Sequence, residues 1–246
     1  MKVIAINSSR RNKNTYSLIM QVKKILEKYQ IQMEIINLHD FKLNYCFGCE
    51  NCIINNHCPI NDDYQKIIDK IIKADGVIFS SPVYLKNVSG ILKVLFDRSC
   101  SLYHRPIFYK KPSLVIATTK GSGLKNTLAY LKSISTQLGF IYCGKIGRSI
   151  FTMKNNIKEK EVKKFINYLK SDSSIHQPSL NEIINFNIQK VLSKCSIKLD
   201  HQYWNDKNWY HMDYYYPCKI SFLKKMIGKI IYSLLSMIII KNKFNN

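Results

Sequence analysis

The amino-acid sequence predicts an α/β fold in which a doubly wound parallel sheet occupies residues 1–150. Two observations carry that prediction. Short apolar, β-branched runs recur along this part of the chain, and segments with helical periodicity separate them. Apolar runs without polar alternation are typical of strands buried on both faces, and intervening helices make such strands parallel. Residues 151–246 show helical periodicity and no comparable strands.

Five segments fit a buried strand. They cover residues 2–7 (KVIAIN), 33–38 (MEIINL), 76–80 (GVIFS), 113–118 (SLVIAT) and a run that begins at 140–143 (FIYC). Helices are predicted in the intervals, because apolar residues recur there every three or four positions. One helix begins near residue 15, and the others cover residues 64–73, 88–99 and 124–138.

The rest of the chain is predicted to be an α-helical extension, which places a domain boundary near residue 150. Amphipathic helices are expected at 157–170 and 179–194, and a helix with a very apolar end at 219–240. Residues 201–218 (HQYWNDKNWYHMDYYYPC) are rich in aromatic side chains. We interpret this aromatic segment as a latch that packs onto the core or onto a partner subunit.

The composition narrows the class of protein. The 246 residues carry 38 Lys and Arg against 16 Asp and Glu, a formal charge of +22, and are 46% hydrophobic. That balance excludes a disordered or collagen-like chain. The charge would suit nucleic acid or anionic lipid, but the sequence lacks the aromatic-plus-basic pattern of a nucleic-acid module, so no nucleic-acid partner is expected. No apolar run is long enough to span a bilayer and no signal peptide is evident, which predicts a cytoplasmic protein.

Ligands of doubly wound sheets bind beyond the carboxyl ends of the strands, so the loops at 8–15, 81–90 and 118–124 are the candidates. The first loop (SSRRNKNT) combines hydroxyls, backbone amides and a helix N-terminus, which favour an anion, and Arg10 adds charge. It matches neither a dinucleotide-binding nor a P-loop motif. The alternative is an ordinary helix start capped by Asn14 or Thr15.

The second loop (SPVYLKNVSG) points to a flat heterocycle. Pro82 holds the chain extended, Tyr84 offers a ring for stacking, and Asn87 can hydrogen-bond a ring edge. A proline-containing turn before a helix is the alternative for this segment.

The cysteines give the strongest signal. Four of the eight lie in one stretch with the spacing C-x2-C-x2-C-x5-C, namely Cys46, Cys49, Cys52 and Cys58. A compact triplet favours an iron–sulfur cluster, and the longer last spacer lets the fourth thiolate complete it. The alternative is a structural zinc site made by all four cysteines, or by three of them and His57. The scattered remainder are interpreted as structural thiols: Cys100, Cys143, Cys195 and Cys218.

Three motifs in this order resemble a known family. They are SSRRNKNT after the first strand, CFGCENCIINNHCPINDD, and ADGVIFSSPVYLKNVSGILKVLFDR. Together they resemble the flavodoxin-like NAD(P)H-dependent FMN reductase superfamily and, within it, the iron–sulfur flavoproteins of anaerobes, over about residues 2–150. The resemblance implies a flavodoxin-like five-stranded sheet of order 2-1-3-4-5, FMN, and a [4Fe–4S] cluster on the four clustered cysteines. It also implies a homodimer or higher homo-oligomer with a cluster near a flavin across the interface.

The resemblance also implies which residues bind FMN. The phosphate loop would use Ser8, Arg10, Asn14 and Thr15. The isoalloxazine loop would use Pro82, Val83, Tyr84, Leu85 and Asn87, and the third loop Thr118, Thr119 and Gly121. The family's first loop commonly begins Gly-Ser-Pro-Arg, whereas this chain has Asn-Ser-Ser-Arg at residues 7–10, so its path departs from the family pattern.

These features predict a flavin-dependent oxidoreductase that moves electrons between NAD(P)H, or a ferredoxin, and an acceptor. The acidic surface of a ferredoxin would suit the positive charge. The alternatives are a non-enzymatic electron carrier or redox sensor, and a flavodoxin-like scaffold or membrane-surface adaptor stabilised by zinc. No side chain stands out as a catalytic acid or base, and no hydrolase motif is present.

The last thirty residues form a separate feature. Residues 217–246 contain six lysines and no acid, so the apolar helix there fits either membrane-surface contact or docking in a dimer interface. Docking is the favoured interpretation, because the segment is too short to span a bilayer.

Overall fold

The computed structural model describes residues 1–171 and 175–243, with side chains up to residue 238. Its centre is a five-stranded sheet in the order β2-β1-β3-β4-β5, and every neighbouring pair is parallel. The strands are β1 (Lys2–Asn7), β2 (Gln32–Asn37), β3 (Gly76–Pro82), β4 (Pro112–Thr118) and β5 (Ile141–Arg148). The predicted fold class and strand order are confirmed.

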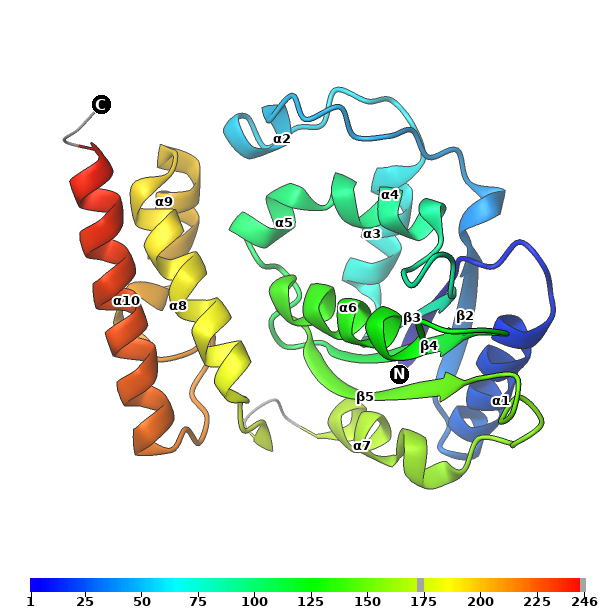
Figure 1. Ribbon diagram of the computed structural model, residues 1–246. Helices are drawn as coiled ribbons and strands as arrows, with labels where there is room; N and C mark the ends of the chain where they lie inside the picture. The colour runs from blue at the N-terminus through cyan, green and yellow to red at the C-terminus, as the bar shows by residue number, and fades with distance from the viewer. Residues whose placement is uncertain (172–174, 244–246) are drawn as a thin grey trace.

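Helices cover both faces of the sheet (Figure 1). One face is covered by α1 (Asn14–Lys28) and α7 (Glu159–Lys170), and the other by α3 (Tyr64–Lys73), α4 (Gly90–Arg98) and α6 (Leu124–Gln137). Alternate strand residues serve the two layers, as the pleat requires. In β1, Val3 and Ala5 face the α1 layer, while Ile4 and Ile6 face the α3 layer.

The remaining elements of the first part are short. They are η1 (Leu38–Asp40), α2 (Asn51–Ile54) and α5 (Cys100–His104). The helix predicted at 88–99 is α4, and α5 follows it as a separate short helix that was not predicted. The sequence marked only the beginning of the fifth strand, at 140–143. The strand continues for five further residues, which include Gly144, Lys145 and Gly147. It lies at the edge of the sheet, so exposed and glycine residues break the apolar run that signals a strand.

The C-terminal part consists of α8 (Leu180–Cys195), α9 (Lys198–Asp206), η3 (Trp209–His211) and α10 (Phe222–Lys243). Its aromatic segment packs inward, with Trp204 and Trp209 at most 1% exposed. The Trp209 ring meets Tyr109, just before β4, edge-on at 5.0 Å between centroids. The aromatic latch thus lies on the core of the same chain. Because α7 also packs on β4 and β5, the helical layers around the sheet continue past residue 150. The domain boundary expected near residue 150 remains a prediction.

Within the described residues, none of the helices is both long and apolar enough to cross a membrane.

Candidate functional site

Three loops meet at the carboxyl edge of the sheet, where the fold predicts a ligand. The hydroxyls of Thr15 and Thr118 are 2.6 Å apart and join the first loop to the third. The backbone N–H of Val83 donates to the carbonyl of Thr118 at 2.8 Å and joins the second loop to the third. The parallel register places these strand ends side by side, which is why residues 103 positions apart share one site.

The loops enclose a cavity of about 300 Å³, at the lower end of the range for ligand pockets. Its lining is hydroxyl-rich and basic and contains no carboxylate. The lining residues are Ser9, Arg11, Lys13, Asn14, Thr15, Pro82, Val83, Tyr84, Thr118, Thr119 and Lys120. Such a lining fits an anionic ligand.

The N-terminus of α1 opens into this cavity through Asn14 and Thr15. No side chain among the described residues caps the helix and its first turn holds no acid, so no anionic partner for its amide groups is found in this part of the chain. Free amides and the helix dipole favour a phosphate at this position. The alternative sequence interpretation, a helix capped by Asn14 or Thr15, is therefore wrong.

The second loop forms a tight turn at the mouth of the cavity. Leu85 and Lys86 both have positive φ, and reciprocal backbone hydrogen bonds between Tyr84 and Asn87 close the turn. This geometry leaves Tyr84 half exposed beside the cavity. Gly123 of the third loop packs against the turn: a Cβ there would lie 2.6 Å from the Cα of Lys86, so only glycine permits the approach.

The structure gathers seven of the twelve predicted flavin-binding residues around the cavity, and the other five lie outside its lining: Ser8, Arg10, Leu85, Asn87 and Gly121. The Ser8 hydroxyl is buried, donating to the carbonyl of Ser80 and accepting from Ser89. The side-chain oxygen of Asn87 accepts from the adjacent Val88 amide.

Sequence reasoning missed four lining residues: Ser9, Arg11, Lys13 and Lys120. No local sequence pattern marks the three of them in the first loop, because the path of that loop depends on the hydrogen bonds that Ser8 makes with Ser80 and Ser89.

The cysteine stretch lies on a long loop between η1 and α3, and its two ends are pinned together. The carboxylates of Asp62 and Asp63 accept from the backbone amides of Asn44 and Lys42, both at 2.8 Å. Arg98 forms a two-pronged ion pair with Asp62 and also donates to the carbonyl of Asn44. Both partners of this ion pair are 1% exposed, so the loop begins and ends on a buried charge pair.

A second arginine holds the middle of the loop. Arg105 donates to the backbone carbonyls of Cys52 and Ile53, and it is paired with Asp200 of α9, which is fully buried. Asp200 also accepts from His104 at 2.9 Å, and this hydrogen bond, followed by the influence of Cys100, raises the pKa of His104 to about 9. The C-terminal part of the chain therefore supports the cysteine loop through a buried carboxylate.

The four clustered thiols are free, and no three metal-ligating side chains among the described residues are close enough together to hold a metal ion. Burial, followed by electrostatic repulsion from Cys100 and Cys58, raises the pKa of the Cys52 thiol. As a set of donors, four thiols suit an iron–sulfur cluster or zinc. Gly48 and Glu50 have positive φ, so the backbone turns sharply between the clustered cysteines, as it would have to do to surround a cluster.

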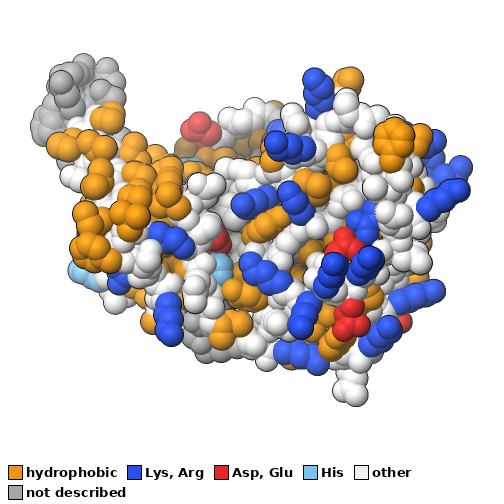
Figure 2. Space-filling model, turned by 60° about the horizontal axis from the view of Figure 1, so that its bottom comes forward, with side chains coloured by type: hydrophobic (Ala, Val, Ile, Leu, Met, Phe, Trp, Pro, Cys, Tyr) orange, Lys and Arg blue, Asp and Glu red, His pale blue; other side chains and the backbone are white. Residues whose placement is uncertain are grey.

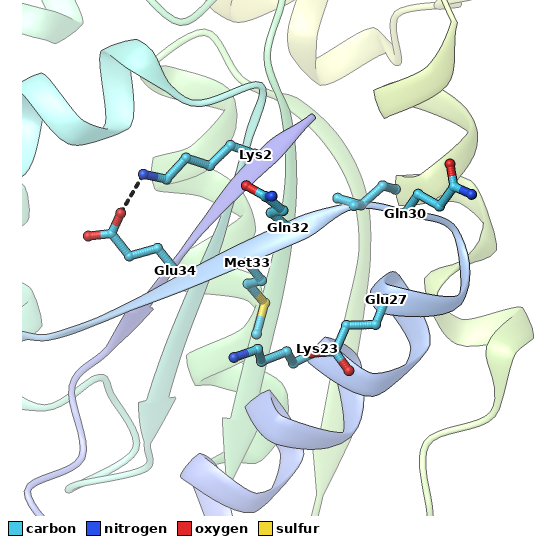
Figure 3. A pocket seen from close by; sticks show the side chains of 8 residues that line it. Lys2, Lys23, Glu27, Gln30, Gln32, Met33 and Glu34 are labelled. Atoms are coloured by element: carbon cyan, nitrogen blue, oxygen red, sulfur yellow. Dashed lines mark ion pairs between the residues drawn. The ribbon is translucent and has the colours of Figure 1, made fainter.

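A larger hollow of about 610 Å³ lies elsewhere, between the C-terminal end of α1 and β2 (Figure 3). Two of its charged residues already form an ion pair, since Lys2 contacts Glu34 at 2.6 Å, and Lys70 from outside the lining pairs with the same carboxylate. It also borders the beginning of β1, opposite the edge where such sheets bind ligands. The smaller cavity at the strand ends is therefore the candidate site.

The family model for NADPH-dependent FMN reductase matches residues 1–150. The chain belongs to this family. Within it, an iron-sulfur flavoprotein of Clostridioides difficile strain 630 is 31% identical over 215 residues, which cover 82% of this chain and 94% of that relative. An iron-sulfur flavoprotein of Archaeoglobus fulgidus is 36% identical over 126 residues, covering 51% of this chain and 61% of its own length. The chain is an NAD(P)H-dependent FMN oxidoreductase of the iron–sulfur flavoprotein type.

Solved structures agree on the fold. RosB, solved with bound 8-demethyl-8-formylriboflavin-5'-phosphate, aligns with a TM-score of 0.56 at 13% identity and covers 90% of this chain and 92% of its own. A flavone reductase aligns with a TM-score of 0.53 at 14% identity over 70% of this chain and 62% of that protein.

Proposed function

We propose that this FMN reductase family member passes electrons between FMN and a [4Fe–4S] cluster held by Cys46, Cys49, Cys52 and Cys58. NAD(P)H or a ferredoxin would be the electron donor. The single observation that supports flavin binding best is the carboxylate-free cavity at the uncapped N-terminus of α1. When bound there, FMN exchanges two electrons with a nicotinamide and single electrons with a cluster.

Each side of the cavity suits one part of the flavin. The amides at Asn14 and Thr15, with Arg11 and Lys13, would hold the phosphate, because these groups combine donors with positive charge. The ring would lie against the backbone of Pro82 and Val83 and the face of Tyr84. The half-exposed tyrosine leaves this side open to a nicotinamide.

Two arginines would support the cluster. Arg105 contacts the carbonyl of Cys52, and Arg98 lies beside Cys58 in a hollow of about 330 Å³. Positive charge next to thiolate ligands stabilises their ionised form, and net charge around a cluster tunes its potential.

We further propose a homodimer or larger assembly in which a second subunit covers the cysteine loop. Tyr45, Phe47 and Ile54 are 80%, 68% and 51% exposed there. Large apolar side chains around a cofactor loop are typical of a surface that a partner buries.

Anaerobic titration with NADH and NADPH tests the function. We expect at least one of the two nucleotides to reduce the flavin, seen as a loss of its visible absorbance, and to support turnover with a quinone or oxygen. Reduction without turnover would favour the electron-carrier alternative. Failure of NADH, NADPH and reduced ferredoxin to reduce the flavin would contradict the proposal.

A further inference from the structure

The last helix is fixed in rotation by its contact with α8. Gly228 packs directly on α8, where an added Cβ would lie 2.8 Å from both Ile183 and Asn187. On the same side, Lys190 and Lys194 each lie 5.4 Å above the Tyr232 ring. These contacts determine which side of α10 faces outward.

The outward side is almost entirely apolar, and Figure 2 shows it as a continuous hydrophobic patch at one end of the molecule. Its residues recur every three or four positions over more than four helical turns and are each at least 43% exposed. They are Phe222, Leu223, Met226, Ile230, Leu234, Met237 and Ile238. We call these seven residues the α10 face. A contiguous exposed apolar surface of this kind marks an interaction site.

Lysines of α10 itself lie beside the α10 face. Lys229 is exposed there, and Lys225 pairs with Asp213 at 2.9 Å. The sequence of α10 contains no Asp or Glu, and it continues to Lys241 and Lys243, whose side chains lie outside the described part. An apolar helix face with a basic border is typical of helices that lie in the surface of an anionic membrane.

Charge favours a membrane over a second copy of the chain. At this face the sequence of α10 offers no carboxylate to the lysines of a neighbouring α10, whereas anionic headgroups would neutralise them. Position agrees with this: Figure 1 shows α10 on the side of the sheet away from the strand arrowheads, so docking there leaves the flavin cavity open. We propose that the α10 face docks on the surface of a bilayer that contains anionic phospholipid.

Vesicle sedimentation of the full-length holoprotein tests this proposal. We expect binding to vesicles of phosphatidylcholine with about one-third phosphatidylglycerol at low salt, and at least about tenfold weaker binding to phosphatidylcholine alone. Raising the salt to about 0.5 M should release the protein, because surface charges are screened. The test does not depend on electron transfer, so its failure leaves the proposed function intact.

Two variants locate the contact. Leu234→Glu should weaken vesicle binding at least about tenfold, since it puts a charge in the apolar face. Ile72→Glu, at an exposed apolar site on α3, should leave binding unchanged. Lys229→Gln should weaken binding about fivefold, because each lysine near an anionic surface contributes about 1 kcal/mol. Vesicle binding that survives Leu234→Glu would overturn the proposal. So would a protein that does not bind vesicles and whose molecular mass by light scattering is lower in Leu234→Glu than in the wild type, and this result would assign the α10 face to a second copy of the chain.

Discussion

The flavin cavity and the cysteine loop lie on the same chain but are built in different ways. The cavity is formed by strand ends whose separation is set by the sheet, and direct hydrogen bonds between Thr15, Thr118 and Val83 join its loops. The cysteine loop is pinned at its ends by Asp62 and Asp63 and in its middle by Arg105, while its thiols stay apart. The fold thus prepares the proposed phosphate site in advance, whereas the proposed cluster would have to gather its own ligands.

The largest expected effect separates the two regions directly. Cys52→Ser should lower iron from about four atoms per chain to below about one, because one ligand is lost, while FMN stays near one per chain. Metal analysis and flavin absorbance on anaerobically purified protein measure both. Cys195→Ser, at the end of α8, is the control and should keep its iron. A parallel loss of FMN in Cys52→Ser would show that the regions are not independent.

The second effect concerns the base of the cysteine loop. Arg98→Met should destabilise the chain by about 3–5 kcal/mol, because it leaves the buried Asp62 carboxylate without its cationic partner. Urea unfolding followed by circular dichroism measures the change. Lys93→Met removes a surface ion pair with Asp97 and should cost less than about 1 kcal/mol. Equal costs for the two variants would mean that the loop base is not a stability centre.

The third effect tests the cavity. Thr15→Val should weaken FMN binding by about 1.5–3 kcal/mol, roughly tenfold to a hundredfold, because it removes a hydroxyl from the phosphate site. Flavin fluorescence titration of apoprotein gives the dissociation constants. Thr127→Val is the matched control, because the Thr127 hydroxyl is buried with no hydrogen-bond partner among the described residues and its loss should be harmless. Unchanged FMN affinity in Thr15→Val would place the phosphate elsewhere.

The smallest effect is a pH dependence at the link between α9 and the cysteine loop. The folded-state pKa of His104, about 9, lies above its ordinary value of 6.5, so the protonated form stabilises the fold. That stability is fully present below about pH 6.5 and is lost as the pH rises through about 9. His104→Gln and Asp200→Asn should each flatten this part of the curve of unfolding free energy against pH. A curve that keeps its slope in both variants would exclude the pair as its source.

The sequence predicted the cavity better than the support of the cysteine loop. Apolar runs identified five buried strands, and parallel strands bring their carboxyl ends together, so Pro82, Tyr84 and Thr118 were placed correctly in the cavity. The path of residues 8–13 was not predictable, because it depends on the buried bonds that hold Ser8 to the second loop.

Pairings distant along the chain carry no such pattern. Asp200 meets Arg105 across 95 residues, and nothing in the local sequence of α9 distinguishes this carboxylate from a solvated one. The positions of the thiols could not be predicted either. The spacing C-x2-C-x2-C-x5-C identifies four candidate ligands, but it does not specify the metal that they would bind.

Metal and flavin analysis of the wild-type protein, purified without oxygen, tests the central claim most directly. Coexistence of the two cofactors on one chain predicts brown-yellow protein with about four iron atoms and one FMN per chain. Colourless protein that contains zinc and no flavin would contradict it.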